Sequence, residues 1–388
     1  MKSWGRFEVL VIVLVLAITG ASMPQAISAV KAGSSCKKQG ELITVSNRTY
    51  TCVKSGKKLV WDKGFAFSKD YSIYLATKQK AYKNIRDAAD QGDSSKINLI
   101  YHIGADFPSQ ILELYRNQVQ YSANLFGTFF PEPVTVNIYM YTEKDADAIK
   151  NDPALNFNAS EFQDWFDRWA VGADRQHNIG IAANYMTARG QEIPQGYAGL
   201  ALYSKSTLTS LRAYSVQVMP HEFFHVVQDY YIQSARNERF PDSESYDRYF
   251  PPIFREGSAN TISFALASNT FEDYENLYSG FIKEKKNQES QIPIFSKMDS
   301  VSHIVETLKK MESKSTSPDV HEASYSIGQL VFEWVISEYG FKGYRNLIVN
   351  QLAGIDFNDN VKKSLGINLN QLYEKAAPHI YRAFTQNR

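Results

Sequence analysis

The stretch PHEFFHVVQ, residues 220–228, carries two histidines four positions apart with a glutamate directly after the first. On an α-helix, residues four apart lie one above the other on the same face, so His221 and His225 can present both imidazoles to one metal ion. Glu222 lies roughly 100° around the helix from His221, so its carboxylate can reach a water molecule beside that ion without binding the ion. The stretch therefore predicts a helix that carries part of a zinc site.

The HExxH pattern alone is a moderate signal, because it arises by accident in roughly one sequence in a hundred at this histidine content. A zinc site that performs hydrolysis needs a third protein ligand and an open position for water. The candidate is Glu256 in PPIFREGSAN, where residues 256–259 fit the pattern E-x-x-A and Glu256 is expected to open a helix. Gly257 and Ala259 are small enough to let this helix pack closely against the first. The alternative is a Glu256 that only stabilises the start of its helix through the helix dipole.

The other histidines lack partners at the spacing of metal ligands, and they are expected to be structural or surface residues. They are His102, His177, His303, His321 and His379.

The N-terminus predicts export. Lys2 and Arg6 precede the apolar run VLVIVLVLAI, residues 9–18, and small and polar residues follow it. This order is typical of a secretory signal peptide over residues 1–29, and the run is short for a membrane-spanning helix. The expected location is therefore secreted or in the cell envelope. The alternative is an uncleaved N-terminal anchor that tethers the protein to the outer face of a membrane.

Cys36 and Cys52 are the only cysteines, and both follow the predicted signal in a short polar segment. An oxidising compartment favours a disulfide between them over a metal site or a reactive pair. Residues 33–64 alternate as strands do and predict a small β module, which is too small to be stable without a cross-link. The segment resembles a short cysteine-pair module of exported actinobacterial proteins that ends in a lysine-rich turn and a tryptophan, here SGKKLVW at residues 55–61.

The rest of the chain predicts a helical linker over residues 65–94 and an α+β domain over residues 95–388. Four segments of the domain alternate apolar and polar residues and are expected to be strands: INLIYHIG, VTVNIYMYT, NIGIAANYM and YAGLALYS. From Leu211 onward the pattern is almost wholly helical. Strands first and helices later indicate a mixed sheet followed by a mostly helical half, rather than a doubly wound α/β fold.

The segments HEFFH (221–225), EGSA (256–259) and YSIGQLVFEWVISEYG (325–340) together resemble the gluzincin zinc metallopeptidases of the peptidase MA-like clan. The resemblance covers roughly residues 95–388, and its metal-site part is the specific one. It implies a thermolysin-like catalytic domain in which His221, His225 and Glu256 hold one Zn²⁺ per chain.

The resemblance also implies a mechanism and further site residues. Peptide bonds would be hydrolysed by zinc-activated water, with Glu222 as the general base and Tyr325, at the start of its helix, steadying the oxyanion. A plain core aromatic is the alternative for Tyr325, because its fit rests on spacing alone. Members of the family carry an aspartate four residues after the glutamate ligand, which orients a histidine, whereas this chain has Asn260. An amide oxygen can accept an imidazole N–H but does not raise ligand basicity as a carboxylate does.

Gln228 lies one helical turn beyond His225 and is a second candidate for contact with a metal ligand. The alternative for Gln228 is a glutamine that faces solvent.

The charge balance excludes partners that are chosen by bulk charge. Lys and Arg number 42 against 41 Asp and Glu, so no global field collects nucleic acid or anionic membrane. The expected partner is a peptide or protein substrate, with a membrane contacted only through an uncleaved N-terminal segment. Two other functions compete: a catalytically inactive envelope protein that uses the same scaffold for binding or structure, and an exported lipid- or glycan-binding protein with an accidental motif.

Overall fold

A computed structural model of the 388-residue chain describes residues 30–37, 42–45, 48–63, 65–66, 69–145, 147–148, 179–186, 195–211, 213–239, 250–313, 317–352 and 354–385. The chain divides into two compact units, Met1–Ser72 and Ile73–Arg388. Helices and strands are both present in the order expected, so the α+β class is confirmed. The predicted signal peptide lies outside the described residues. No helix in the described part of the chain has the length and hydropathy needed to cross a membrane.

The first unit is a small antiparallel sheet with β2 at its centre. Its strands are β1 (Leu42–Val45), β2 (Arg48–Ser55), β3 (Lys58–Trp61) and β4 (Phe65–Ala66). The predicted disulfide is confirmed and joins Cys36 to Cys52 of β2. Cys52 and its cross-strand partner Trp61 are both buried. Residues 65–66, expected in the linker, instead pair with β2 as β4.

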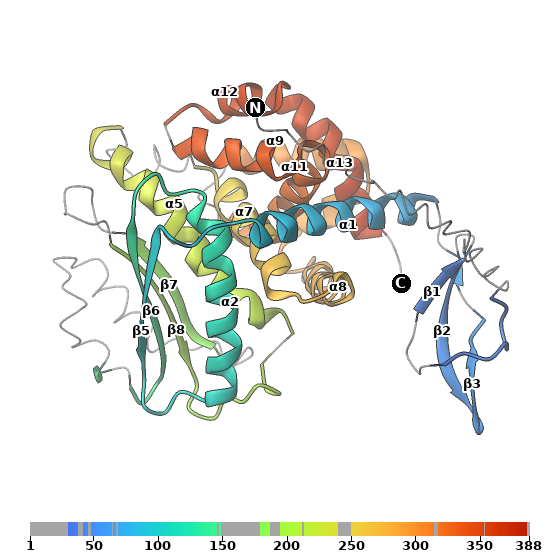
Figure 1. The fold of residues 1–388 in the computed structure, drawn as a ribbon. Helices are drawn as coiled ribbons and strands as arrows, with labels where there is room; N and C mark the ends of the chain where they lie inside the picture. Colours follow the sequence, from blue (N-terminus) through green and yellow to red (C-terminus); the bar gives the residue numbers. More distant parts are fainter. Residues whose placement is uncertain are drawn as a thin grey trace, which may run out of the picture. The chain divides into compact units, whose positions relative to one another are not determined.

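The second unit contains a four-stranded mixed sheet in the order β5-β6-β8-β7. Helix α1 (Lys69–Asp90) precedes the first strand of this sheet in the chain, and α2 (Ser109–Gly127) connects its first two strands (Figure 1). The strands are β5 (Ile97–Ile103), β6 (Val134–Thr142), β7 (Ile179–Met186) and β8 (Gln195–Leu202), which are the four predicted segments. β5, β6 and β8 run parallel, whereas β7 pairs antiparallel to β8. β6 has paired strands on both sides and is buried at nearly every position.

The remainder of this unit is helical. Its elements are η1 (Ala213–Gln217), α5 (Val218–Arg239), α7 (Pro252–Ala267), α8 (Phe271–Asn287), η2 (Pro293–Lys297), α9 (Val301–Ser313), α10 (Pro318–Ala323), η3 (Ser324–Gly328), α11 (Gln329–Leu352), α12 (Phe357–Leu365) and α13 (Leu369–Thr385). Helix α5 packs against β7 and β8 on one side and against α7 on the other. Every residue of α7 from Pro252 to Leu266 except Arg255 is buried. The two helices that carry HExxH and E-x-x-A are therefore the core of the unit.

Two helix boundaries differ from expectation. Helix α7 begins at Pro252, because proline at the first helical position lacks only an amide proton that would be unpaired there anyway. Glu256 therefore lies in the second turn, beyond the region where the helix dipole acts strongly on a carboxylate. Tyr325 does not open a helix. It lies in η3, a π-helical turn that follows α10 directly and continues into α11.

Candidate metal centre

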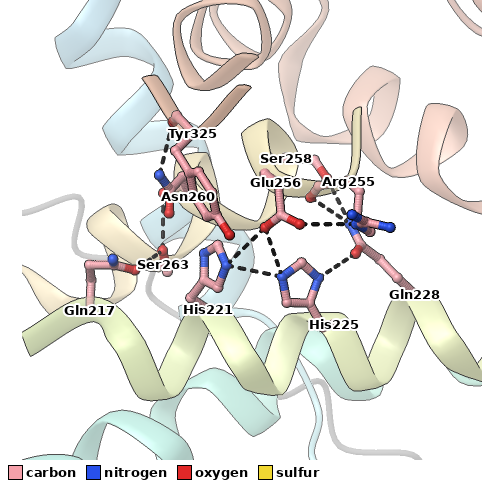
Figure 2. Close-up of polar contacts among 10 residues, drawn as sticks. All are labelled: Gln217, His221, His225, Gln228, Arg255, Glu256, Ser258, Asn260, Ser263 and Tyr325. Atoms are coloured by element: carbon pink, nitrogen blue, oxygen red, sulfur yellow. Dashed lines mark hydrogen bonds and ion pairs between the residues drawn. The ribbon is translucent and has the colours of Figure 1, made fainter. Parts of the chain in front are cut away.

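The three predicted zinc ligands converge between α5 and α7. His221 and His225 project from one face of α5, and the Glu256 carboxylate points at them from α7 (Figure 2). Their exposed fractions are 5%, 6% and 4%. Among the residues that the structure describes, these three form the one group of at least three His, Cys, Asp or Glu side chains placed to hold a metal ion.

The distances between the three donor atoms fit one zinc ion. Nε2 of His221 and Nε2 of His225 lie 3.0 Å apart. Oε2 of Glu256 lies 3.4 Å from Nε2 of His221 and 3.2 Å from Nε2 of His225. Around a tetrahedral zinc with bonds of about 2 Å, ligand atoms are about 3.3 Å apart. The donor triangle therefore has the size that zinc requires, and its chemistry of two imidazoles and one carboxylate leaves a fourth position for water.

Opposite charges keep the Glu256 carboxylate ionised. Burial alone would raise the pKa of Glu256, but His225, the hydrogen bond from His221 and the Arg255 guanidinium hold this pKa well below its usual value. Nε of Arg255 lies 2.9 Å from Oε1, which leaves Oε2 to face the imidazoles. Burial alone would lower the pKa of His225, whereas Glu256, Glu222 and Gln228 raise this pKa to about 9. A metal ion competes with protons for these same lone pairs.

Gln228 is buried beside the site, so the solvent-facing alternative is wrong. Its exposed fraction is 1%, and its Oε1 lies 2.7 Å from Nδ1 of His225. Its Nε2 donates hydrogen bonds to atoms of α7. The helical spacing indicated a contact between Gln228 and His225, whereas the burial of Gln228 comes from the packing of α7 on α5.

Asn260 does not contact a histidine through a hydrogen bond. Its Nδ2 donates to the backbone oxygen of Tyr325 at 2.9 Å. Its Oδ1 accepts no hydrogen bond from any residue in the described ranges, and the same holds for Nδ1 of His221. The expected bond from an imidazole N–H to the Asn260 oxygen is therefore absent here, because the amide is turned toward the π-helical turn.

Tyr325 lies over the site. Its ring stacks on His221 with centroids 5.8 Å apart and planes 27° apart. Figure 2 shows its hydroxyl pointing toward His221 and the Glu256 carboxylate. Burial raises the pKa of Tyr325 well above its usual value, and the charges of Glu256 and Glu222 add to this effect. The hydroxyl therefore stays protonated at neutral pH and can donate a hydrogen bond.

Glycines bring the π-helical turn against α7. A Cβ atom on Gly257 would lie 2.4 Å from the carbonyl carbon of Gly328, and one on Gly328 would lie 2.5 Å from the Ile253 oxygen. Real Cβ atoms do not approach so closely. Gly257 was expected to let the two ligand helices pack together, but its close contact is with the Tyr325 turn instead.

Glu222 follows His221 on α5 and is half-buried. Its negative charge contributes to the raised pKa of both His225 and Tyr325, so its carboxylate lies within electrostatic reach of the two side chains. A carboxylate in this position can accept a proton from a water molecule held at the donor triangle. Arg255 and Ser258 complete the surroundings of the site. No spacing rule in the sequence singles out these two residues.

Comparison with known proteins gives a match at the level of a family model. Residues 185–342 match the model of a family described as "Putative zinc dependent peptidase (DUF5700)". The matched segment starts in β7 and ends in α11, so it contains His221, Glu222, His225, Glu256 and Tyr325. No curated protein and no solved structure matches the chain. The part of the chain that carries the candidate metal centre is thus similar to a family whose description names zinc-dependent peptidase activity as putative.

Proposed function

We propose that this protein is an exported zinc-dependent peptidase of the gluzincin type. The observation that carries the proposal is the buried donor triangle of His221, His225 and Glu256, with its spacings of 3.0 to 3.4 Å. The family match supports peptide-bond chemistry at this site. The disulfide between Cys36 and Cys52 supports an oxidising compartment, and the N-terminal segment supports export.

Three polar side chains beside the donor triangle have roles in amide hydrolysis. Zinc, when bound, supplies a Lewis acid that lowers the pKa of a water molecule to about 7. Glu222 would accept a proton from this water as the water oxygen attacks the carbonyl carbon, and would return the proton to the leaving amine as the C–N bond breaks. The protonated hydroxyl of Tyr325 donates to the carbonyl oxygen as negative charge develops on it. Arg255 neutralises part of the Glu256 charge and holds the oxygen that faces away from the imidazoles.

The test is the Glu222→Gln variant, because glutamine keeps the shape of the side chain but cannot accept the proton. The purified wild type should contain about one zinc per chain and cleave members of a diverse peptide library. The variant should keep the zinc and lose about 10²- to 10⁴-fold in rate. A wild type without stoichiometric zinc, or a variant that cleaves as fast as the wild type, would refute the mechanism.

The second candidate is an inactive gluzincin scaffold with a binding or structural role. Asn260 favours it, since this amide contacts a backbone carbonyl instead of orienting a metal ligand. This candidate predicts a wild type that binds zinc but cleaves no peptide in the library. The third candidate is a lipid- or glycan-binding protein in which the HExxH motif is accidental. This candidate predicts that His221→Ala leaves the metal content unchanged.

A further inference from the structure

Gln228 connects the second histidine of α5 to the backbone of α7. Its Oε1 lies 2.7 Å from Nδ1 of His225. Its Nε2 lies 3.1 Å from the backbone oxygen of Arg255 and 2.9 Å from Oγ of Ser258. Arg255 is the residue before Glu256, so this one side chain contacts a candidate ligand on α5 and the helix turn that carries the candidate ligand on α7 (Figure 2).

The neighbours on α7 determine which way the Gln228 amide points. The backbone oxygen of Arg255 can only accept a hydrogen bond, so the Gln228 atom that faces it must be the nitrogen. The Ser258 hydroxyl donates to the same backbone oxygen at 3.2 Å, so its oxygen is left to accept from Gln228. Two independent contacts therefore turn the amide oxygen toward His225.

The direction of the amide in turn determines the tautomer of His225. An amide oxygen accepts hydrogen bonds and cannot donate them, so Nδ1 of His225 must carry a proton. A neutral imidazole protonated at Nδ1 has its lone pair on Nε2. Nε2 is the atom that faces Nε2 of His221 and Oε2 of Glu256.

His221 has no comparable support. Its Nδ1 has no hydrogen-bond partner among the residues that the structure describes. The two imidazoles are therefore held differently: His221 packs against the Tyr325 ring, whereas His225 is fixed by a hydrogen bond. Loss of the Gln228 contact should consequently affect metal binding through His225 and not through His221.

We propose that Gln228 is a positioning residue that selects Nε2 of His225 as the metal-binding atom. It holds this nitrogen at the correct distance from Glu256 by tying α5 to the Arg255–Ser258 turn of α7. Because the amide is neutral, it orients the imidazole without adding negative charge to the site. The inference rests on the proposed zinc site but does not require peptidase activity.

The experiment measures the zinc affinity of the purified protein by competition with a chelator of known affinity. Gln228→Met keeps an unbranched side chain of similar length but removes both the donor and the acceptor. It should weaken zinc binding by about 10- to 100-fold, the usual effect of losing a group that orients a ligand. Gln228→Glu keeps an acceptor for Nδ1 but loses the donor to the Arg255 oxygen, so it should bind zinc more tightly than Gln228→Met, since a carboxylate also raises ligand basicity.

Gln217 provides a matched control. It is a buried glutamine in the turn before α5, and its Oε1 accepts a 2.7 Å hydrogen bond from the Ser263 hydroxyl of α7. It ties the start of α5 to α7 through this hydrogen bond, and its described hydrogen bonds include none to a histidine. Gln217→Met should therefore leave the zinc affinity within about threefold of the wild type, against the 10- to 100-fold loss expected for Gln228→Met.

Three results would overturn the inference. The first is a Gln228→Met variant that binds zinc as tightly as the Gln217→Met control. The second is a Gln228→Glu variant that binds zinc as weakly as Gln228→Met. That result would show that only the hydrogen bonds from Gln228 to α7 affect zinc binding. The third needs no variant: in nitrogen-resolved NMR spectra of the zinc-loaded wild type, His225 should carry its proton on Nδ1, and metal bound at Nδ1 would contradict the proposal. A wild-type protein that binds no zinc would contradict the proposed function rather than this inference. The metal content of the purified protein distinguishes the two cases.

Discussion

The side-chain amide of Asn260 donates a 2.9 Å hydrogen bond to the backbone oxygen of Tyr325. On the next residue of α7, the Thr261 hydroxyl donates to the backbone oxygen of Gln329 at 3.0 Å. Both oxygens belong to or adjoin the π-helical turn, where the regular α-helical hydrogen bonds are interrupted. Helix α7 therefore carries the Glu256 side chain into the metal centre and also supports the turn that presents Tyr325.

Replacing Asn260 by aspartate should show whether this side chain stabilises the fold or orients a histidine. Aspartate cannot donate to the Tyr325 backbone oxygen, so the variant loses this part-buried hydrogen bond and the free energy of unfolding should fall by about 1–3 kcal/mol. Zinc affinity should stay unchanged, because no histidine depends on the Asn260 side chain in the structure. The measurements are chemical denaturation and zinc competition. If Asn260→Asp instead tightens zinc binding without loss of stability, the side chain at position 260 orients His221.

The contact between Gly257 and Gly328 predicts a steric effect on the Tyr325 turn. In Gly257→Ala the new Cβ would lie 2.4 Å from a backbone atom, so α7 and the turn must move apart. The unfolding free energy should fall by about 1–3 kcal/mol, the usual cost of overpacking. Gly280→Ala in α8 is the matched control, since a Cβ there meets nothing within 4 Å. That variant should be more stable than the wild type by about 0.5–1 kcal/mol. Equal effects of the two substitutions on the urea midpoint would contradict the tight packing.

The sequence was informative where the chemistry depends on local spacing. His221 and His225 share a helix, so their common face follows from the helical repeat alone. The four strand segments followed from alternation, and the disulfide from the compartment and the cysteine count. Glu256 is distant in sequence from the histidines, and only the pattern E-x-x-A together with HExxH indicated it.

The remaining features depend on tertiary packing. A π-helical turn has no sequence signature in its residue types, so Tyr325 was expected at a helix start. The Asn260 amide could bond an imidazole or a backbone carbonyl equally well, and only the close approach at Gly328 decides between them. The sequence left two positions possible for the Gln228 side chain, one facing solvent and one beside the site. The packing of α7 decides between them, because the buried position includes the contact with Ser258.

The Tyr325 hydroxyl should affect turnover and leave metal binding unchanged. Tyr325→Phe keeps the ring that stacks on His221 but removes the donor, so kcat should fall by about 10²- to 10³-fold with little change in KM. Tyr115→Phe is the control, because it removes a buried hydroxyl that donates to the backbone oxygen of Ser215 outside the metal centre. Peptide cleavage and zinc content are measured for both variants. A Tyr325→Phe enzyme with wild-type kcat would assign the residue to packing alone.

A second buried charge cluster lies apart from the proposed chemistry, where α1, α8, α11 and α13 meet. Glu333 is fully buried, accepts a hydrogen bond from the Tyr274 hydroxyl and lies 2.7 Å from Nε2 of His379. The ammonium group of Lys78 lies over the Tyr278 ring at 3.8 Å. Burial alone would raise the pKa of Glu333, but the contact with His379 and the charge of Lys78 outweigh it and lower this pKa below 4.5.

The lowered pKa of Glu333 sets the direction of an acid effect on stability. A carboxyl whose pKa is lower in the folded state stabilises the fold fully above its unfolded pKa, and this contribution is lost as pH falls through the folded pKa. Glu333→Gln removes the negative charge that interacts with the buried ammonium group of Lys78, so the variant should lose about 3–5 kcal/mol at pH 7. The difference from the wild type should narrow as the pH falls below about 4.5. Urea unfolding from pH 7 to pH 3.5 measures this difference, and Glu338→Gln on the exposed face of α11 should change stability by no more than about 0.5 kcal/mol. A Glu333→Gln deficit that stays constant over this pH range would show that folding does not lower the pKa of Glu333.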